Sequence, residues 1–342
     1  MTKLEKLIRA EIAQTGPMPV SRYMELCLTH PEHGYYVKRD PFGVDGDFTT
    51  APEISQMFGE LIGLWLLQVW QDQGCPAPFR LVELGPGRGT LLVDALRAAR
   101  MVPAFGEAAD LWLVEASPRL RALQIAKLPQ AQWADRLEEV PDGPTLLVAN
   151  EFFDALPIRQ FITGPDEMTE ILVGCDPTGA LTMGRFEPAR GEDGPIGWTE
   201  VSPAQEPITR EISRRIMQHG GAALVIDYGY RADDRPNGPT LQAVRRHEKV
   251  PPLTAPGDCD LTWLVDFDRL SAQLKTSRVT TQGAFLAAIG IGQRAQALAA
   301  RDSGQTDSIA AALHRLTAPD QMGTLFKVLA AVPETAPPPP GF

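Results

Sequence analysis

The chain has 342 residues, of which 44% are hydrophobic, so it can bury a large core and can hold two or three domains or one domain with large insertions. Its formal net charge is −11 and no long basic run stands out, which argues against nucleic acid as the main partner. The four cysteines are scattered without a CxxC pair, which argues against a structural zinc site or a disulfide framework.

The first residues predict an amphipathic helix, because Leu4, Leu7, Ile8 and Ile12 recur at helical spacing. Acidic residues are mixed with the basic ones there, unlike a signal or transit peptide. The most apolar helix, around Leu61–Trp70, is too short to span a bilayer. We therefore expect a cytoplasmic protein without membrane insertion.

Further along, we expect a helix at Ser21–Leu28, an ordered loop at His30–Gly46 and a long helix from Thr50 to about Gln73, begun by a capping box with Glu53. From Phe79 onward, short apolar strands alternate with helices. The expected strands are Arg80–Leu84, Leu111–Glu115, Gln132–Ala134, Thr145–Ala149 and Ala222–Asp227, and the expected helices are Gly89–Arg100, Pro118–Lys127, one starting near Glu151, and Ile208–His219. This alternation predicts a parallel sheet with helices on both faces.

The remaining segments are less regular. Polar, Gly/Pro-rich or loop-rich stretches occupy Gly164–Pro203 and Arg231–Pro256, helices are expected at Thr281–Ile289 and Ala295–Ala300, and Gly323–Ala331 is expected to return to the sheet. We expect residues 1–75 to form an N-terminal cap and 76–233 the α/β core, with an insertion at about 164–203. A substrate-side insertion would cover 234–320, a return strand 321–334 and a disordered tail 335–342.

A glycine-rich turn follows the first strand of this sheet. Its residues are Glu83, Gly85, Gly87, Gly89 and Thr90, in the order ELGPGRGT. Glycines let the backbone turn sharply and approach a ligand, and the following helix N-terminus offers free N–H groups. The strand Leu111–Glu115 ends in an acid that can hold a ribose diol.

Two cofactor classes compete for this signal. Sites for NAD prefer GxGxxG, whereas Thr90 stands where the third glycine would be. The acid Glu83 before the turn would repel a pyrophosphate but suits the cationic sulfonium of S-adenosylmethionine (SAM), which we therefore expect as the cofactor. Asp135, after the third strand, could accept a hydrogen bond from the adenine amino group or be an ordinary loop acid.

A polar segment, Asn150–Pro157, follows the fourth strand. The carboxyl ends of parallel strands line the ligand cleft, so this segment should face the reacting methyl group. Alternatively, Asn150 and the acids Glu151 and Asp154 could simply favour the start of a helix.

Other polar residues have weaker signals. The loop with Asp47, Thr49, Thr50 and Glu53 could close over the cofactor, or Thr50 and Glu53 could only cap the helix. His30 and His33 are expected to make structural hydrogen bonds, because no ligand cluster accompanies them. Asp227 and Tyr228 could line the target channel, or Tyr228 could be a core aromatic.

Together, several blocks resemble the MidA-type methyltransferases, relatives of a mitochondrial complex I assembly factor that methylates arginine. The resemblance covers most of the chain, and departures at Leu241–Arg245 and Cys259 bear on the substrate more than on the cofactor. The blocks are His30–Tyr36, Pro41–Gly43, Gly46–Ser55, Glu83–Thr90, Asn150–Pro157, Asp227–Gly229, Leu241–His247, Gly257–Phe267 and Gly323–Ala330.

The resemblance implies a class I methyltransferase fold, SAM as cofactor, and symmetric dimethylation of an arginine on the 49-kDa-type subunit of respiratory complex I. It also implies that the N-terminal region covers the active site. Because a guanidinium stays protonated near neutral pH, methylation calls for carboxylates that bind it and take its proton. Glu151 and Asp154 are the candidates, with Asn150 orienting. The alternatives are a small-molecule methyltransferase, a NAD-dependent oxidoreductase and a non-catalytic assembly factor.

Overall fold

A computed structural model describes residues 1–38, 50–164, 168–186, 197–245 and 248–342. The chain forms two compact units, each assembled from separate stretches of sequence. We call one the sheet unit (Thr49–Phe153, Ile208–Ala232 and Val265–Phe342) and the other the meander unit (Met1–Phe48, Asp154–Pro207 and Asp233–Leu264). These boundaries differ from the expected ones, because residues 50–75 and 265–320 pack within the sheet unit.

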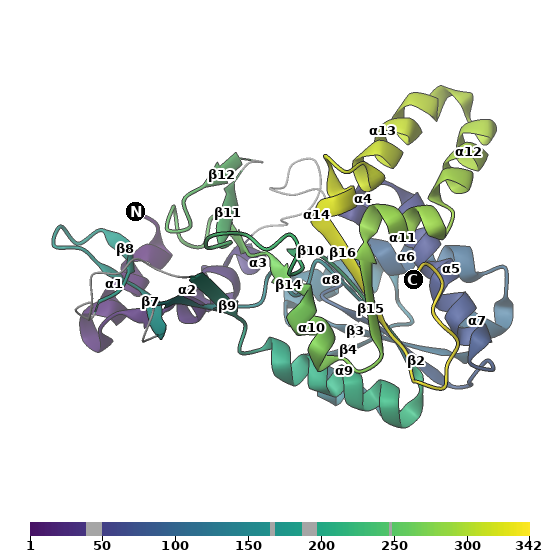
Figure 1. Cartoon of the computed structure of the whole chain (residues 1–342), viewed down its shortest axis with the longest axis horizontal. Coiled ribbons are helices and arrows are strands. Elements are labelled where there is room, and N and C mark those ends of the chain that lie inside the picture. The colour runs from purple at the N-terminus through teal and green to yellow at the C-terminus, as the bar shows by residue number, and fades with distance from the viewer. Residues whose placement is uncertain (39–49, 165–167, 187–196, 246–247) are drawn as a thin grey trace. The chain divides into compact units, whose positions relative to one another are not determined.

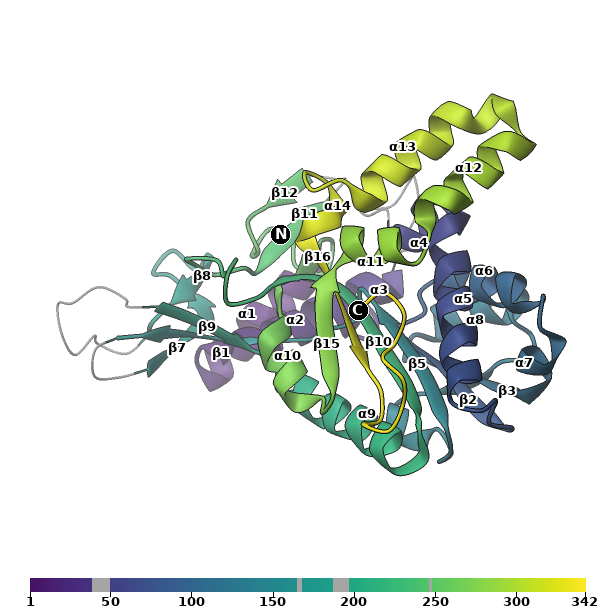
Figure 2. The same ribbon diagram turned by 45° about the vertical axis from the view of Figure 1, so that its right-hand side comes forward.

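The sheet unit is built on an 8-stranded sheet among the described residues, ordered β15-β16-β10-β5-β2-β3-β4, with β14 beside β10. Figure 2 shows β15, β10, β5, β2 and β3 in this order across the sheet. Neighbours from β10 to β4 pair in parallel, whereas β16 runs antiparallel to both β10 and β15. The strands are β2 (Phe79–Leu84), β3 (Ala109–Val114), β4 (Gln132–Ala134), β5 (Thr145–Asn150), β10 (Gly221–Tyr230), β14 (Val265–Asp266), β15 (Ser277–Thr281) and β16 (Phe326–Ala331). This confirms the expected doubly wound, mostly parallel α/β sheet.

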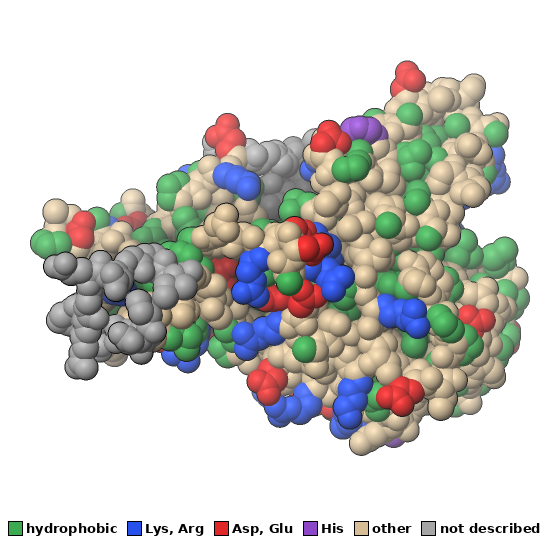
Figure 3. Space-filling view, in the orientation of Figure 1, with side chains coloured by type: hydrophobic (Ala, Val, Ile, Leu, Met, Phe, Trp, Pro, Cys, Tyr) green, Lys and Arg blue, Asp and Glu red, His purple; other side chains and the backbone are tan. Residues whose placement is uncertain are grey.

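Burial explains why the central strands were recognisable. Every residue of β5, β10 and β16 is buried, as expected of strands covered on both faces. The helices are α4 (Ala51–Ile54), α5 (Gln56–Asp72), α6 (Thr90–Ala99), α7 (Pro103–Ala108), α8 (Pro118–Lys127), α9 (Gln205–His219), α10 (Phe267–Gln273), α11 (Gln282–Ala288), α12 (Ile291–Arg301), α13 (Thr306–Thr317) and α14 (Met322–Leu325), with short 3₁₀ turns η1 (Leu137–Glu139) and η2 (Ser303–Gln305). Acidic and basic side chains are mixed along the exposed side of α9 (Figure 3).

Close helix packing in this unit depends on small residues. A Cβ at Gly63 would lie 2.3 Å from the carbonyl oxygen of Ala95, and one at Gly59 would lie 2.7 Å from the Cβ of Asp94. The absence of side chains at these two glycines therefore lets α5 approach α6. Beyond them, α12 and α13 form a hairpin that projects from the sheet (Figure 1), tied to α5 by hydrogen bonds from Arg294 to the buried Glu60.

The C-terminal tail is packed, contrary to the expectation of disorder. The indole Nε1 of Trp65 donates to the carbonyl oxygen of Pro340 at 2.9 Å. The rings of Phe342 and Phe285 lie 5.4 Å apart. A polyproline run cannot join a sheet, but its free carbonyl oxygens can still accept hydrogen bonds and the aromatic end can be buried.

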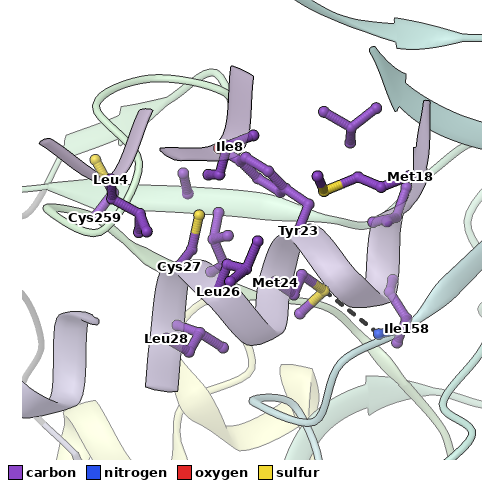
Figure 4. Packing of buried hydrophobic residues seen from close by; sticks show 14 of the residues in the cluster. Leu4, Ile8, Met18, Tyr23, Met24, Leu26, Cys27, Leu28, Ile158 and Cys259 are labelled. Carbon is purple, nitrogen blue, oxygen red and sulfur yellow. Dashed lines mark hydrogen bonds between the residues drawn. The ribbon is translucent and has the colours of Figure 1, made fainter. Parts of the chain in front are cut away.

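The meander unit combines helices with antiparallel strands. Its helices are α1 (Lys3–Thr15), α2 (Val20–Thr29) and α3 (Tyr35–Lys38); its described strands are β1 (Met18–Pro19), β6 (Arg159–Thr163), β7 (Met168–Cys175), β8 (Leu181–Gly184), β9 (Gly197–Val201), β11 (Gln242–Arg245), β12 (Glu248–Val250) and β13 (Asp260–Thr262). Figure 4 shows the core of this unit, where Leu4 and Ile8 of α1 pack with Tyr23 and Cys27 of α2. The stretch Gly164–Pro203 was expected to be irregular, but its described residues include the strands β7, β8 and β9.

Two expected helices differ from those observed. The helix expected from Thr50 to Gln73 is divided at Ser55, which has extended backbone and accepts a hydrogen bond from Met57 N–H, so it caps α5. No helix begins near Glu151 in the described chain, where a turn follows β5 instead. Over the described residues, no helix has the length and apolar composition needed to cross a membrane.

Candidate functional site

The glycine-rich turn lies between β2 and α6, at the carboxyl edge of the parallel strands. Gly85, Gly87 and Gly89 have φ of +61°, +52° and +73°, in the left-handed region that favours glycine. Gly89 is the N-cap of α6 and makes no side-chain cap. The turn therefore presents backbone and a helix N-terminus, as the sequence predicts for a nucleoside-binding site.

Glu83, two residues before Gly85, is buried with an exposed fraction of 3%. Its Oε2 atom has no hydrogen-bond partner among the described residues. Burial, followed by the nearby charge of Glu115, raises the pKa of Glu83 to about 8. A buried acceptor without a partner at this position fits a cofactor that carries donor groups and a positive charge.

Glu115 directly follows β3, and its carboxylate accepts hydrogen bonds from the backbone N–H of Ser117 at 2.8 Å and from Gln124 at 3.3 Å. Burial raises the pKa of Glu115. The sequence reasoning missed Gln124, which is fully buried and also donates to the Gly87 carbonyl oxygen at 2.7 Å. The available signal was its spacing, four residues after Leu120 on the buried face of α8.

Thr90 connects three helices through its side chain. Its hydroxyl donates to Glu53 of α4 at 2.5 Å and accepts from Lys127 of α8 at 3.2 Å. Glu53 also lies 3.7 Å from the guanidinium of Arg88. Glu53 therefore binds Thr90, at the end of the glycine-rich turn, and does not form the expected capping box. The side chain of Thr50 makes no cap hydrogen bond either.

Two further cofactor predictions, at Asp135 and Thr49, stay predictions. Asp135 is largely exposed and pairs with Arg121 at 2.5 Å, so its contact with adenine stays a prediction. Thr49, and Asp47 in the same loop, lie outside the described residues.

Two of the predicted catalytic residues lie where β5 ends: Asn150 is its last residue, and Glu151 begins the turn that follows. Asn150 is 9% exposed; its Nδ2 donates to Glu151 Oε1 at 3.1 Å, and its Oδ1 has no partner among the described residues. The same Glu151 oxygen accepts from Ala51 N–H at 3.1 Å. Glu151 has φ of +51°, which is unusual for a non-glycine residue.

Asp154, the third predicted catalytic residue, belongs to the meander unit. It is buried, and its carbonyl oxygen accepts from Trp263 N–H at 3.2 Å. In that same unit, His30 Nδ1 accepts from the backbone N–H groups of Glu32 and His33, at 3.2 and 3.3 Å. The structural interpretation of His30 is thereby confirmed, and no cluster of His, Cys, Asp or Glu among the described residues could hold a metal.

Comparisons with known proteins agree with this geometry. Residues 61–285 match the family described as "Putative S-adenosyl-L-methionine-dependent methyltransferase", and the chain belongs to that family. A crystal structure of a COG1565 superfamily member from Burkholderia thailandensis, bound to S-adenosyl-homocysteine, has a TM-score of 0.83 and 27% identity and covers 99% of this chain and 93% of its own. The fold is therefore the class I methyltransferase fold, and the cofactor is SAM.

Curated relatives are similar over nearly the whole chain. The Drosophila melanogaster protein named "Protein arginine methyltransferase NDUFAF7 homolog, mitochondrial" is 36% identical, covering 96% of this chain and 85% of its own. The Homo sapiens protein named "Protein arginine methyltransferase NDUFAF7, mitochondrial" is 35% identical, covering 97% and 84%. Because these relatives are named mitochondrial, the expectation of a cytoplasmic protein is contradicted. The match to a methyltransferase family also argues against the alternative of a NAD-dependent oxidoreductase.

The residues present fit SAM, which supplies an activated, electrophilic methyl group. Gly85, Gly87 and Gly89 give the turn its left-handed backbone, Glu83 offers a buried acceptor, and Glu115 follows β3, the position at which the sequence predicts an acid that holds a ribose.

Proposed function

We propose that this chain methylates an arginine side chain of a protein substrate. The names of the curated relatives support this reaction, since they are called protein arginine methyltransferases and are 34% to 36% identical over at least 94% of this chain. The resemblance in sequence extends the proposal to symmetric dimethylation on the 49-kDa-type subunit of respiratory complex I.

The observation that carries the proposal is the pair of acceptors at the end of β5. A guanidinium has N–H donors and no acceptor, so its binding site must consist of acceptors. Asn150 Oδ1 is a buried acceptor without a partner in the described chain, and the hydrogen bond from Nδ2 to Glu151 fixes the amide in that orientation. Beside it, the Glu151 carboxylate supplies a negative charge.

These residues would divide the chemical work. Glu151 would bind the guanidinium, draw its charge toward one nitrogen and hold the proton that the attacking nitrogen releases. Asn150 Oδ1 would orient a second N–H group of the guanidinium. Asp154 belongs to the meander unit, and its role as a second acceptor stays a prediction from the sequence.

The test is methyl transfer from labelled SAM to the purified 49-kDa-type subunit, located by mass spectrometry. We expect dimethylated arginine with the intact chain and none with Gly87→Val. Glu151→Gln should lower transfer by about 10²-fold or more, because a general base is lost, while SAM affinity is retained. Glu107→Gln, an exposed carboxylate on α7, is the matched control and should transfer normally. Full activity of Glu151→Gln would remove Glu151 from the mechanism.

A further inference from the structure

The buried carboxylate of Asp227 accepts hydrogen bonds from the turn after β5. This turn begins with Glu151 and directly follows Asn150, the two proposed arginine-binding residues. Asp227 lies near the end of β10 and is 0% exposed. Its Oδ2 accepts from the backbone N–H groups of Phe152 and Phe153 at 3.2 and 2.9 Å, and its Oδ1 accepts from Tyr228 N–H at 3.0 Å. Both oxygens are therefore bound to backbone groups, and one of them, Oδ2, reaches two consecutive residues of the turn after β5.

These hydrogen bonds lie next to Glu151, whose backbone conformation is unusual for a non-glycine residue. The ladder between β5 and β10 pairs Asn150 with Ile226, and Glu151 N–H still donates to the Ile226 carbonyl oxygen at 2.9 Å. The next N–H groups leave the ladder and go to Asp227. Glu151 thus sits between two fixed points, with φ of +51°, a conformation that persists only where the surroundings impose it.

We infer that Asp227 is a positioning residue, whose carboxylate holds Glu151 and Asn150 in the geometry that receives the guanidinium. This inference rests on the proposed function. Without the carboxylate, Glu151 could relax to negative φ, and its side chain would leave the hydrogen bonds to Ala51 and Asn150. Asp227 touches backbone groups of the turn and acts on the reaction through them.

The substitution Asp227→Asn tests this role, because asparagine keeps the shape but loses the charge. The amide offers one neutral acceptor oxygen in place of two charged ones. Its NH₂ group would face the Tyr228 N–H donor in one orientation and the Phe152 and Phe153 N–H donors in the other, so hydrogen bonds to backbone are weakened or lost in both. The matched control is Glu60→Gln, which also changes a buried carboxylate of the sheet unit to an amide but is bonded to Arg97 and Arg294 on other helices. Thermal unfolding of each variant checks that it folds.

Amide hydrogen exchange at Phe152 and Phe153, measured without substrate, reports whether residue 227 still accepts hydrogen bonds from these two N–H groups. We expect protection of both amides to fall by about ten-fold or more in Asp227→Asn and to stay unchanged in Glu60→Gln. We expect kcat for arginine methylation to fall by a similar factor, with SAM affinity changed by less than about three-fold, whereas a merely structural role would lower stability alone.

Unchanged exchange at both amides, or an unchanged kcat, would overturn the inference. If Asp227→Asn does not fold, Asp227→Glu retains the charge but displaces the carboxylate by one methylene, and the same losses are expected. If the intact chain transfers no methyl group to arginine, the proposed function fails, while the exchange measurement still shows whether Asp227 holds the turn.

Discussion

Replacing Glu83 by glutamine should stabilise the cofactor-free protein by an amount that grows with pH. An unfolded glutamate titrates near 4.5, whereas burial beside Glu115 raises the pKa of folded Glu83 to about 8. Between these values the folded state binds the extra proton, so raising the pH favours unfolding. The full gap, at about 1.4 kcal/mol per pH unit, corresponds to at most about 5 kcal/mol of lost stability above pH 8.

Glutamine does not titrate and avoids this loss. The advantage of Glu83→Gln in the free energy of unfolding should therefore grow by about 2 to 3 kcal/mol between pH 5 and pH 7. Urea unfolding of both proteins at each pH measures it, and taking the difference cancels the other titrating groups. Parallel stability curves for the two proteins would refute the reasoning, because they would mean that Glu83 is already ionised at pH 5 when folded.

Two other changes probe the glycine-rich turn and the C-terminus. In Gly85→Ala the new Cβ would lie 2.8 Å from Phe152 Cδ2 on a backbone with φ of +61°, so SAM affinity should fall by about ten-fold or more in calorimetric titration; unchanged affinity would contradict the assigned site. Deleting residues 338–342 removes the Trp65 hydrogen bond and the contact of Phe342 with Phe285, and should lower the free energy of unfolding by about 2 to 3 kcal/mol in urea titrations. A truncated chain as stable as the intact one would mean that these contacts do not stabilise the fold, as expected of a disordered tail.

Much of the α/β core was predictable because its signals are local. The strand at β2, the glycines after it and the helix at α8 each follow from neighbouring residues, and the helix bounds Pro118–Lys127 match those observed. The helix expected near Glu151 was wrong for a physical reason. Asn150 and the acids after it have the composition of a helix start, but the Phe152 and Phe153 N–H groups bind Asp227, more than 70 residues away.

The sequence by itself determined the order of strands and helices, the glycine turn and the acids that follow the strands, because periodicity and backbone conformation depend on residues close together in the chain. Only the tertiary structure decided which carboxylates are partnered. Asp227 holds a turn, Glu53 binds Thr90, and Glu83 keeps a buried oxygen without a partner in the described residues. Burial and hydrogen bonding join residues from distant segments, and these contacts give chemically identical carboxylates different pKa values and different tasks.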